Sequence, residues 1–370
     1  MGGGRHRDVP REEGKGPKQI SIRVPFHRFG WSRPREGEPK NHMTGMDIVR
    51  AYLRTSRGEY LIAEIPALLT LFFLGATSPY RLLAPVVLEG IAVFILLFFF
   101  GFIINAYADQ DIDGKYTIFK NRIPEAVRLL GQRNTRLIMI VQVAAAFILT
   151  AHISYQMGSW VPVALVAVGT FLGAGYSMPP LHFKVRGWLH PVSLALSVFF
   201  IPAAFVLFTI AGSLSNGAIV FLLGVAILHY GIEFANQAID YLEDMAGGVL
   251  SPPVRWGMGR SLKVALAAIS AGMVLELAGL YFMIIDRAGG NGIMGLAPPV
   301  FFVLSMPIIM AGYFLPASGL WKMYKAAISR PMEEAVEYMK GICHYNQWQA
   351  SGIMGLMVVG GIMFFAALVA

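Results

Sequence analysis

Long apolar stretches separated by short polar ones are the main feature of this sequence. Nine stretches of roughly 18 to 24 residues are dominated by aliphatic residues, Phe and Gly, and each is close to the ~20 residues that a helix needs to cross a bilayer. The pattern predicts an all-α polytopic membrane protein with nine transmembrane helices. The nine predicted spans cover residues 60–77, 85–108, 137–157, 159–178, 189–211, 217–236, 264–285, 293–315 and 351–370.

The polar segments divide the chain into three parts. Residues 1–43 are rich in Gly, Pro and charge with no apolar period, which predicts a flexible basic cytoplasmic tail. Residues 44–58 interleave apolar and Arg positions, so an amphipathic helix on the membrane surface is expected there. Residues 59–370 then form the nine-helix domain. The longest loop between spans, 316–350, has a helix-start signature at Ser329 and predicts a further cytoplasmic helix.

Composition excludes a water-soluble protein and narrows the chemistry. Of the 370 residues, 56% are hydrophobic and only 14% are charged, against about 25% charged in soluble domains. The single cysteine, Cys343, excludes an intramolecular disulfide and a Cys-rich metal site. The formal net charge of +8 could indicate nucleic acid in a soluble chain. Here the positive charge follows membrane topology, and no nucleic-acid partner is expected.

The distribution of positive charge predicts the orientation. Of the 30 Lys and Arg residues, 28 lie before the first predicted span or after an even-numbered one, and only Arg81 and Arg287 lie on the other side. Basic loops usually face the cytoplasm. We therefore expect a protein of the inner, cytoplasmic membrane, with its N-terminus and even-span loops in the cytoplasm and its C-terminus outside.

Carboxylates gather at two cytoplasmic span ends, after the second and sixth predicted spans. Both groups follow the pattern Asn-x-x-x-Asp-x-x-x-Asp, and a spacing of four places side chains on one helix face. Like charges at this spacing repel, so a hard cation such as Mg²⁺, with substrate phosphates completing its shell, would stabilise them. We call these groups the first Asp ladder, Asn105, Asp109 and Asp113, and the second Asp ladder, Asn236, Asp240 and Asp244.

Basic residues surround both ladders. For any one of them, membrane topology is a sufficient explanation, and one acidic stripe alone could be a solvated helix end. Two matching stripes beside bases, however, are typical of a site for a metal-bridged diphosphate. The nearby bases are Lys115, Lys120, Arg122, Lys184 and Arg255.

At these motifs the sequence resembles the UbiA superfamily of intramembrane prenyltransferases, which are nine-helix proteins with two Asp-rich motifs. The first ladder is similar to the family's Asn-Asp-x-x-Asp-x-x-x-Asp, with Ala106 in place of the first Asp. Residues 176–184 resemble the family's Tyr-Ser-x-Pro-Pro-x-Arg-x-Lys, with His182 in place of Arg. Residues 240–244 match Asp-x-x-x-Asp, and residues 246–257 are similar to the quinone-type (menaquinone-type) branch.

The resemblance implies Mg²⁺-dependent transfer of an isoprenyl group from an allylic isoprenyl diphosphate to a lipophilic, aromatic quinone precursor. The site would lie in a central cavity that opens toward the cytoplasm, and membrane lipid would surround the bundle. The carried-over metal ligands and catalytic residues are Asp109, Asp113, Asp240 and Asp244, with Tyr176 at the reacting centre. The carried-over substrate-binding residues are Asn105, Tyr107, Lys115, Lys120, Arg122, Ser177, Lys184, Asn236 and Arg255.

Two other functions remain open from the sequence. An isoprenoid cyclase of the same fold would need no acceptor. A secondary transporter could use paired carboxylates for cation coupling, although transporters place such acids near the bilayer midplane and both ladders lie at span ends. Ionisable residues inside the spans are suspects by default, and among them Glu276 is interpreted as a structural carboxyl.

Overall fold

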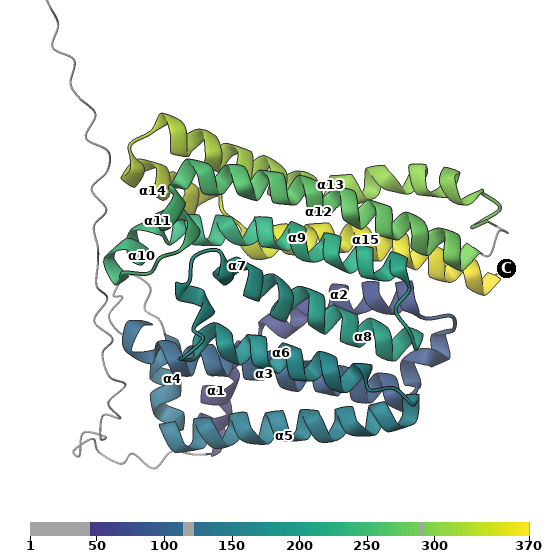
Figure 1. Ribbon diagram of the computed structural model, residues 1–370, viewed down its shortest axis with the longest axis horizontal. Helices are drawn as coiled ribbons and strands as arrows, with labels where there is room; N and C mark the ends of the chain where they lie inside the picture. The colour runs from purple at the N-terminus through teal and green to yellow at the C-terminus, as the bar shows by residue number, and fades with distance from the viewer. Residues whose placement is uncertain (1–44, 114–121, 289–291, 370) are drawn as a thin grey trace, which may run out of the picture. The chain divides into compact units, whose positions relative to one another are not determined.

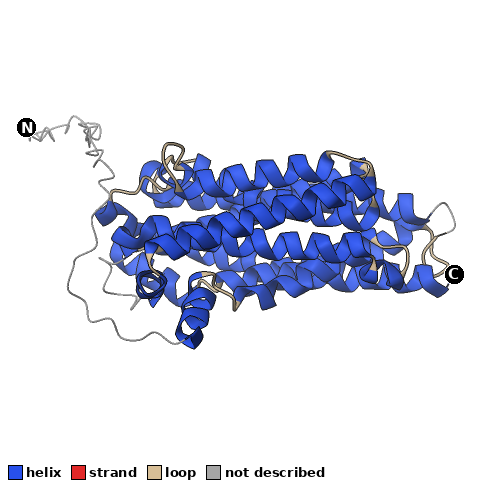
Figure 2. Cartoon of the chain, turned by 90° about the horizontal axis from the view of Figure 1, so that it is seen from below, coloured by secondary structure: helices blue, strands red, loops and turns tan. Residues whose placement is uncertain are grey.

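Helices, and no strands, make up the secondary structure of the residues that the computed structural model describes, 45–113, 122–288 and 292–369 (Figure 2). The long helices run side by side, and short helices occupy the turns at their ends. The elements are α1 Gly45–Thr55, α2 Tyr60–Gly75, η1 Pro79–Leu83, α3 Pro85–Asp113, α4 Arg122–Leu130, α5 Gln132–Met157, α6 Val161–Ser177, η2 Phe183–Val185, α7 Leu189–Leu194, η3 Ala195–Phe200, α8 Ile201–Ala211, α9 Asn216–Ile239, α10 Tyr241–Gly247, α11 Pro252–Trp256, α12 Met258–Ala288, α13 Pro298–Ser329, α14 Met332–Ile342 and α15 Tyr345–Val369.

Seven helical segments of the described residues are long and apolar enough to cross a membrane. They are α3, α5, the continuous segment α7–η3–α8, α9, α12, α13 and α15. The first and fourth predicted spans correspond to shorter helices, α2 with 16 residues and α6 with 17. The pair α1–α2 is bent by 54° and would give an eighth crossing if it is one span. The prediction of an all-α polytopic membrane protein is confirmed, and the count of nine stays a prediction.

The cytoplasmic segments differ from their predicted bounds mainly after the eighth span. Helix α13 continues to Ser329, well past the predicted span end at residue 315, because Gly319, Leu320 and Met323 remain buried against neighbouring helices. Helix α14 then begins directly after Pro331, as its sequence signature predicts. Helix α1 lies within the predicted amphipathic segment, and the basic tail 1–43 lies outside the described residues.

Helix contacts arrange the bundle in two groups (Figure 1). In one group α3 packs against α5, α6 and α8, and in the other α12 packs between α9 and α13, which in turn contacts α15. Helix α2 connects the groups, since it packs against both α8 and α15. The ladder-bearing helices α3 and α9 therefore belong to different groups.

The closest helix pair, α9 and α12, is held at short range by glycines. A Cβ atom added at Gly224 would collide with the backbone of Glu276, and one added at Gly279 would collide with the backbone of Phe221. Small residues allow this approach between membrane helices, where van der Waals contact between backbones replaces the hydrophobic effect. The second Asp ladder thus begins on a helix that is closely packed against its neighbour.

Candidate functional site

The two Asp ladders lie at the same end of the bundle. Asp109 is in the last turns of α3, and Asp240 follows the last residue of α9. Figure 1 shows these helix ends beside the short helices α4 and α10. The α6–α7 connection, which carries Lys184 in η2, follows the end of α6.

Lys184 connects the two ladders electrostatically. Its Nζ lies 2.5 Å from Oδ2 of Asp109, and the Asp109 side chain is only 6% exposed. The charge of the same ammonium group also reaches Asp244, in the second ladder, where it offsets part of the rise in pKa that burial causes. One cation from a loop therefore acts on carboxylates from helices that belong to opposite groups of the bundle.

Residues at the end of α6 face both ladders. The Asn105 Nδ2 donates to the Ser177 Oγ at 3.2 Å, which joins the first ladder to α6. The hydroxyl of Tyr176 lies 2.9 Å from Nε2 of His190, within electrostatic range of Asp109 and Asp244. Tyr176 thus interacts with residues of both ladders through charge, and its role at the reacting centre stays a prediction.

The second ladder carries more negative charge than its surroundings balance. Burial, together with repulsion from Asp244 and two nearby glutamates, raises the pKa of Asp240 to about 7, although Lys340 opposes this. Burial raises the pKa of Asp244 to about 6, despite a hydrogen bond from Ser251 and the charge of Lys184. Such carboxylates favour an additional cation, because a nearby positive charge stabilises their ionised form.

Glu233 extends the second ladder one turn deeper into the bundle. Its Oε1 lies 3.5 Å from Nδ2 of Asn236, and its Oε2 accepts a hydrogen bond of 2.5 Å from the hydroxyl of Tyr345, on α15. The Tyr345 oxygen in turn accepts a bond of 2.6 Å from Gln349 Nε2. Sequence reasoning missed Tyr345 and Gln349, because nothing in the start of the last span connects it to α9.

Arg255, on α11, places a second cation against the α6–α7 loop that carries Lys184. A Cβ added at Gly187, whose φ is +64°, would lie 2.8 Å from Nη1 of Arg255, so the guanidinium covers this glycine. His182 contributes no charge at neutral pH, since burial and the neighbouring Lys184 lower its pKa. Positive charge in the loop therefore comes from lysine and arginine rather than from the residue in place of the family's Arg.

The remaining expected site residues are only partly described. Tyr107 is partly buried and packs against the apolar group that includes Phe100 and Met139. Asp113 ends α3 and Arg122 begins α4, and their side chains lie outside the described part of the chain. Lys115 and Lys120 also lie outside the described residues.

Metal binding rests on the ladders' chemistry rather than on a preformed cage. In the part of the chain that the structure describes, no three His, Cys, Asp or Glu side chains are arranged to hold a metal ion. Mg²⁺ usually takes only one or two carboxylates, with water and substrate phosphates completing its shell. The raised pKa values of Asp240 and Asp244 fit such an ion, since its charge would stabilise both carboxylates.

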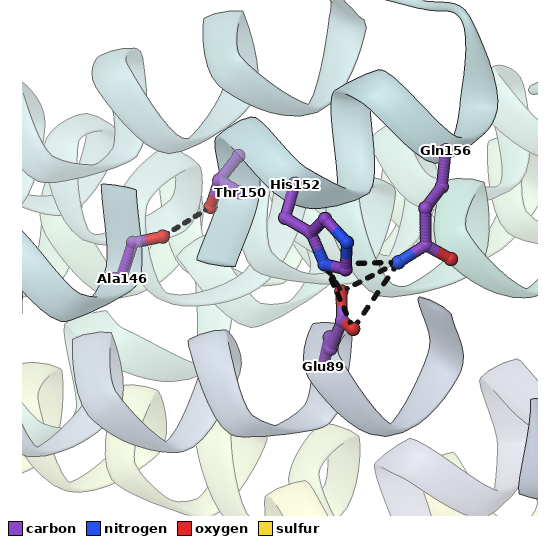
Figure 3. Close-up of polar contacts among 5 residues, drawn as sticks. All are labelled: Glu89, Ala146, Thr150, His152 and Gln156. Carbon is purple, nitrogen blue, oxygen red and sulfur yellow. Dashed lines mark hydrogen bonds and ion pairs between the residues drawn. The ribbon is translucent and has the colours of Figure 1, made fainter. Parts of the chain in front are cut away.

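Other polar side chains of the spans make contacts of their own. Near the opposite end of α3, Nδ1 of His152 lies 3.1 Å from both carboxylate oxygens of Glu89, and Gln156 donates to the same carboxylate (Figure 3). His229 is fully buried and stacks on Phe199 with ring centroids 4.2 Å apart. These groups connect neighbouring helices and take no part in the ladders.

Several solved structures are similar to this chain over most of its length. A homologue of UbiA from Archaeoglobus fulgidus, bound to DMAPP and Mg²⁺, is 17% identical, with 82% of this chain and 99% of that chain covered and a TM-score of 0.57. The same protein bound to GPP and Mg²⁺ gives a TM-score of 0.52 at the same identity and coverage. A digeranylgeranylglyceryl phosphate synthase is 15% identical, covers 85% of this chain and 99% of its own, and gives a TM-score of 0.56.

These likenesses confirm the fold. A comparison with curated proteins finds no match. A sequence profile of the UbiA prenyltransferase family, however, matches residues 65–340, which is most of the chain and includes both ladders. The protein is therefore an integral membrane prenyltransferase that belongs to the UbiA prenyltransferase family.

Proposed function

We propose that this enzyme transfers an isoprenyl group from an allylic isoprenyl diphosphate to a lipophilic, aromatic quinone precursor, with Mg²⁺ as cofactor. The observation that carries the proposal is Lys184, which pairs with Asp109 and also acts on Asp244. A diphosphate between the ladders would meet this ammonium group. The geometry thus favours one shared site over two independent acidic surfaces.

In this proposal the Asp ladders bind the metal ion, and the basic residues, including Lys184 of the α6–α7 loop, bind the diphosphate. Asp109 and Asp113 from α3, with Asp240 and Asp244 after α9, would hold Mg²⁺, which when bound neutralises charge that develops on the diphosphate. Lys184 and Arg255 would bind the diphosphate oxygens directly, together with Lys115, Lys120 and Arg122. Asn105 and Asn236 would orient the ladders, and Asn105 is fixed by Ser177.

The reaction needs a dry pocket next to this charged mouth. The allylic C–O bond breaks with its electron pair leaving on the diphosphate, and the acceptor carbon bonds the allylic carbon and then loses a proton. Lys184 stabilises the leaving group because its charge acts most strongly where negative charge develops. Tyr176 and Tyr107 would border the allylic cation, which aromatic faces stabilise and water would quench.

The relatives support the donor more directly than the acceptor. The A. fulgidus homologue binds DMAPP and GPP together with Mg²⁺, which favours an isoprenyl diphosphate and a divalent metal here. The likeness to digeranylgeranylglyceryl phosphate synthase adds an isoprenoid glyceryl phosphate as a competing acceptor to include in a test. Family membership favours the enzyme over a cation-coupled transporter.

The site would open toward the cytoplasm. The loops at the ladder end carry 15 of the 30 Lys and Arg residues, among them Lys184 and Arg255, whereas the loops at the other end carry only Arg81 and Arg287. Basic loops usually stay in the cytoplasm. A water-soluble or interfacial diphosphate would then enter from that side, while the acceptor would enter from the lipid. The inner, cytoplasmic membrane, with the C-terminus outside, is the location that this topology favours.

Diphosphate release by the purified protein tests the proposal. The enzyme in neutral detergent would be mixed with geranylgeranyl diphosphate and Mg²⁺, and diphosphate would be measured with a hydroxynaphthoate, with an isoprenoid glyceryl phosphate, and with no acceptor. We expect release that depends on the aromatic acceptor. We also expect Asp109→Asn and Asp240→Asn to lose at least about 100-fold in kcat/KM, or ~3 kcal/mol of transition-state stabilisation.

Glu89→Gln is the matched control. It also removes one carboxylate charge from α3, but about 30 Å from Asp109 along the helix, and should change kcat/KM less than threefold. Release without any acceptor would identify a cyclase, and release only with the glyceryl phosphate would replace the aromatic acceptor. Unchanged activity in both Asp variants would remove the ladders from the site.

A further inference from the structure

A second basic site lies at the C-terminal end of α13, and no residue of either Asp ladder lines it. Lys322, Lys325 and Arg330 belong to the last turns of α13 or directly follow it, and Lys263 of α12 lies beside them. None of these four cations forms an ion pair among the residues that the structure describes. The three glutamates of α14, although close in sequence to Arg330, are exposed and do not line the pocket described below.

Aromatic rings hold three of these cations in place. The Nζ of Lys325 lies 5.3 Å from the ring centroid of Trp321, and the Nζ of Lys263 lies 5.6 Å from that of Tyr324. The guanidinium of Arg330 lies 4.1 Å from the Tyr338 ring, on α14. A cation over an aromatic face is positioned without being neutralised, so its positive charge stays available to a ligand.

Three of these four cations line one small pocket. Its volume is about 130 Å³, well below the ~300 Å³ of ordinary small-molecule pockets. This space suits one phosphate group rather than a nucleotide or a peptide. The pocket is lined by Lys322, Lys325, Ala326, Ser329, Arg330 and Tyr338.

The pocket continues a lipid-facing surface of α13. The helix has 32 residues, or about 48 Å at 1.5 Å per residue, while the hydrocarbon layer is ~30 Å thick. Leu304 and Leu315 are exposed, at 60% and 51%, on the face that carries Lys322 two turns after Leu315. Exposed Trp321 marks the level at which aromatic residues meet headgroups. One face of the helix is therefore apolar along the acyl chains and basic at the headgroups.

We propose that this pocket binds the phosphate of an anionic phospholipid whose acyl chains lie along the exposed apolar face of α13. Lys322, Lys325 and Arg330 supply the positive charge, and Tyr338 lines the same pocket. Basic clusters next to a membrane helix attract anionic lipids, and here three such cations line a single pocket of phosphate size. The site is independent of the proposed acceptor, because neither ladder contributes to it.

Lipid titration followed by native mass spectrometry tests this site on the full-length protein in neutral detergent. The probes are phosphatidylglycerol, phosphatidylcholine and inorganic phosphate. The test variant is Lys322→Gln/Lys325→Gln, and the matched control is Arg128→Gln/Arg133→Gln, which removes two exposed charges from α4 and α5. Each cation near an anionic headgroup contributes about fivefold to affinity, so the test variant should bind phosphatidylglycerol about 30-fold more weakly. The control should stay within threefold of the unchanged protein.

Three results would overturn the proposal. Equal binding of phosphatidylcholine and phosphatidylglycerol would mean that headgroup charge has no role. An equal loss in the control variant would mean that net charge, rather than this pocket, attracts the lipid. Binding of inorganic phosphate as tight as that of the lipid would identify a site for a free anion. Arg330→Gln provides a second variant. It leaves both lysines in place and should weaken the binding of phosphatidylglycerol about fivefold.

Discussion

The ion pair between Lys184 and Asp109 gives the sharpest test of the site's geometry. Lys184→Met removes the ammonium group and keeps a side chain of similar length, which leaves the Asp109 carboxylate nearly buried and unpaired. The side chains are 17% and 6% exposed and the two atoms lie 2.5 Å apart. Removing one partner of a buried pair costs about 3–5 kcal/mol. Because Lys184 keeps some contact with water, we expect a loss of about 3 kcal/mol in the free energy of unfolding.

A double-mutant cycle separates the pair from each residue's other contacts. Asp109→Asn should cost less, about 1 kcal/mol, because Lys184 can still interact with Asp244. The double variant should be close to Asp109→Asn in stability, since no buried carboxylate is then left unpaired, and the coupling free energy should be about 3 kcal/mol. Unfolding would be followed by tryptophan fluorescence in mixed micelles without Mg²⁺.

One outcome of the double-mutant cycle would refute the buried ion pair. A coupling free energy below about 0.5 kcal/mol is what exposed pairs give, and it would mean that Lys184 and Asp109 do not form a buried ion pair. The same variants should all lose prenyl transfer, including the double variant whose stability is restored. Restored activity together with restored stability would show that the pair serves the fold rather than the reaction.

Three other contacts lead to further predictions. Burial and the charge of Asp240 raise the pKa of the single thiol, Cys343, to about 11. The alkylation rate of Cys343 should therefore rise about tenfold per pH unit from 7 to 10. Asp240→Asn should shift this dependence of the alkylation rate on pH to lower pH. Gly224→Leu places a side chain against the backbone of Glu276 and should destabilise the protein by about 3 kcal/mol or more, measured as thermal unfolding in detergent. Arg287→Gln removes the bonds from this guanidinium to the carbonyls of Phe73, at 2.5 Å, and of residues near the end of α2, and should cost about 2 kcal/mol in the same measurement.

Each of these has its own control or contradiction. Gly101→Ala, where nothing lies within 4 Å of an added Cβ, should be neutral beside Gly224→Leu, and equal losses at both positions would refute close packing of α9 on α12. An alkylation profile centred near 9, the ordinary thiol value, would mean that Cys343 is solvated. A fully stable Arg287→Gln variant would mean that water satisfies the carbonyls at the end of α2.

Local patterns were enough to place the first ladder on one helix and to assign the fold class. The second ladder was predicted on one helix face, but α9 ends at Ile239 and Asp240 lies at the junction with α10. Apolar runs mark helices in lipid, since every backbone group there must be bonded within the helix, and a spacing of four puts Asp109 in line with Asn105. Family membership and an all-α membrane fold could therefore be predicted from the order of residues along the chain. Hydropathy did not give the end of α13, because helical hydrogen bonds continue into water wherever residues such as Leu320 stay buried.

Only the tertiary structure brought separate segments into contact. Lys184 and Asp109 are 75 residues apart, and Tyr345 and Glu233 are 112 apart, so no local period connects either pair. The sequence alone determined that Asn105 and Asp109 share a face near the end of one helix. The interruption between α9 and α10 at Asp240 became visible only in the structure. Which helices become neighbours depends instead on the fit between side chains, such as the glycine contacts of α9 with α12, because van der Waals packing is effective only between closely matched surfaces.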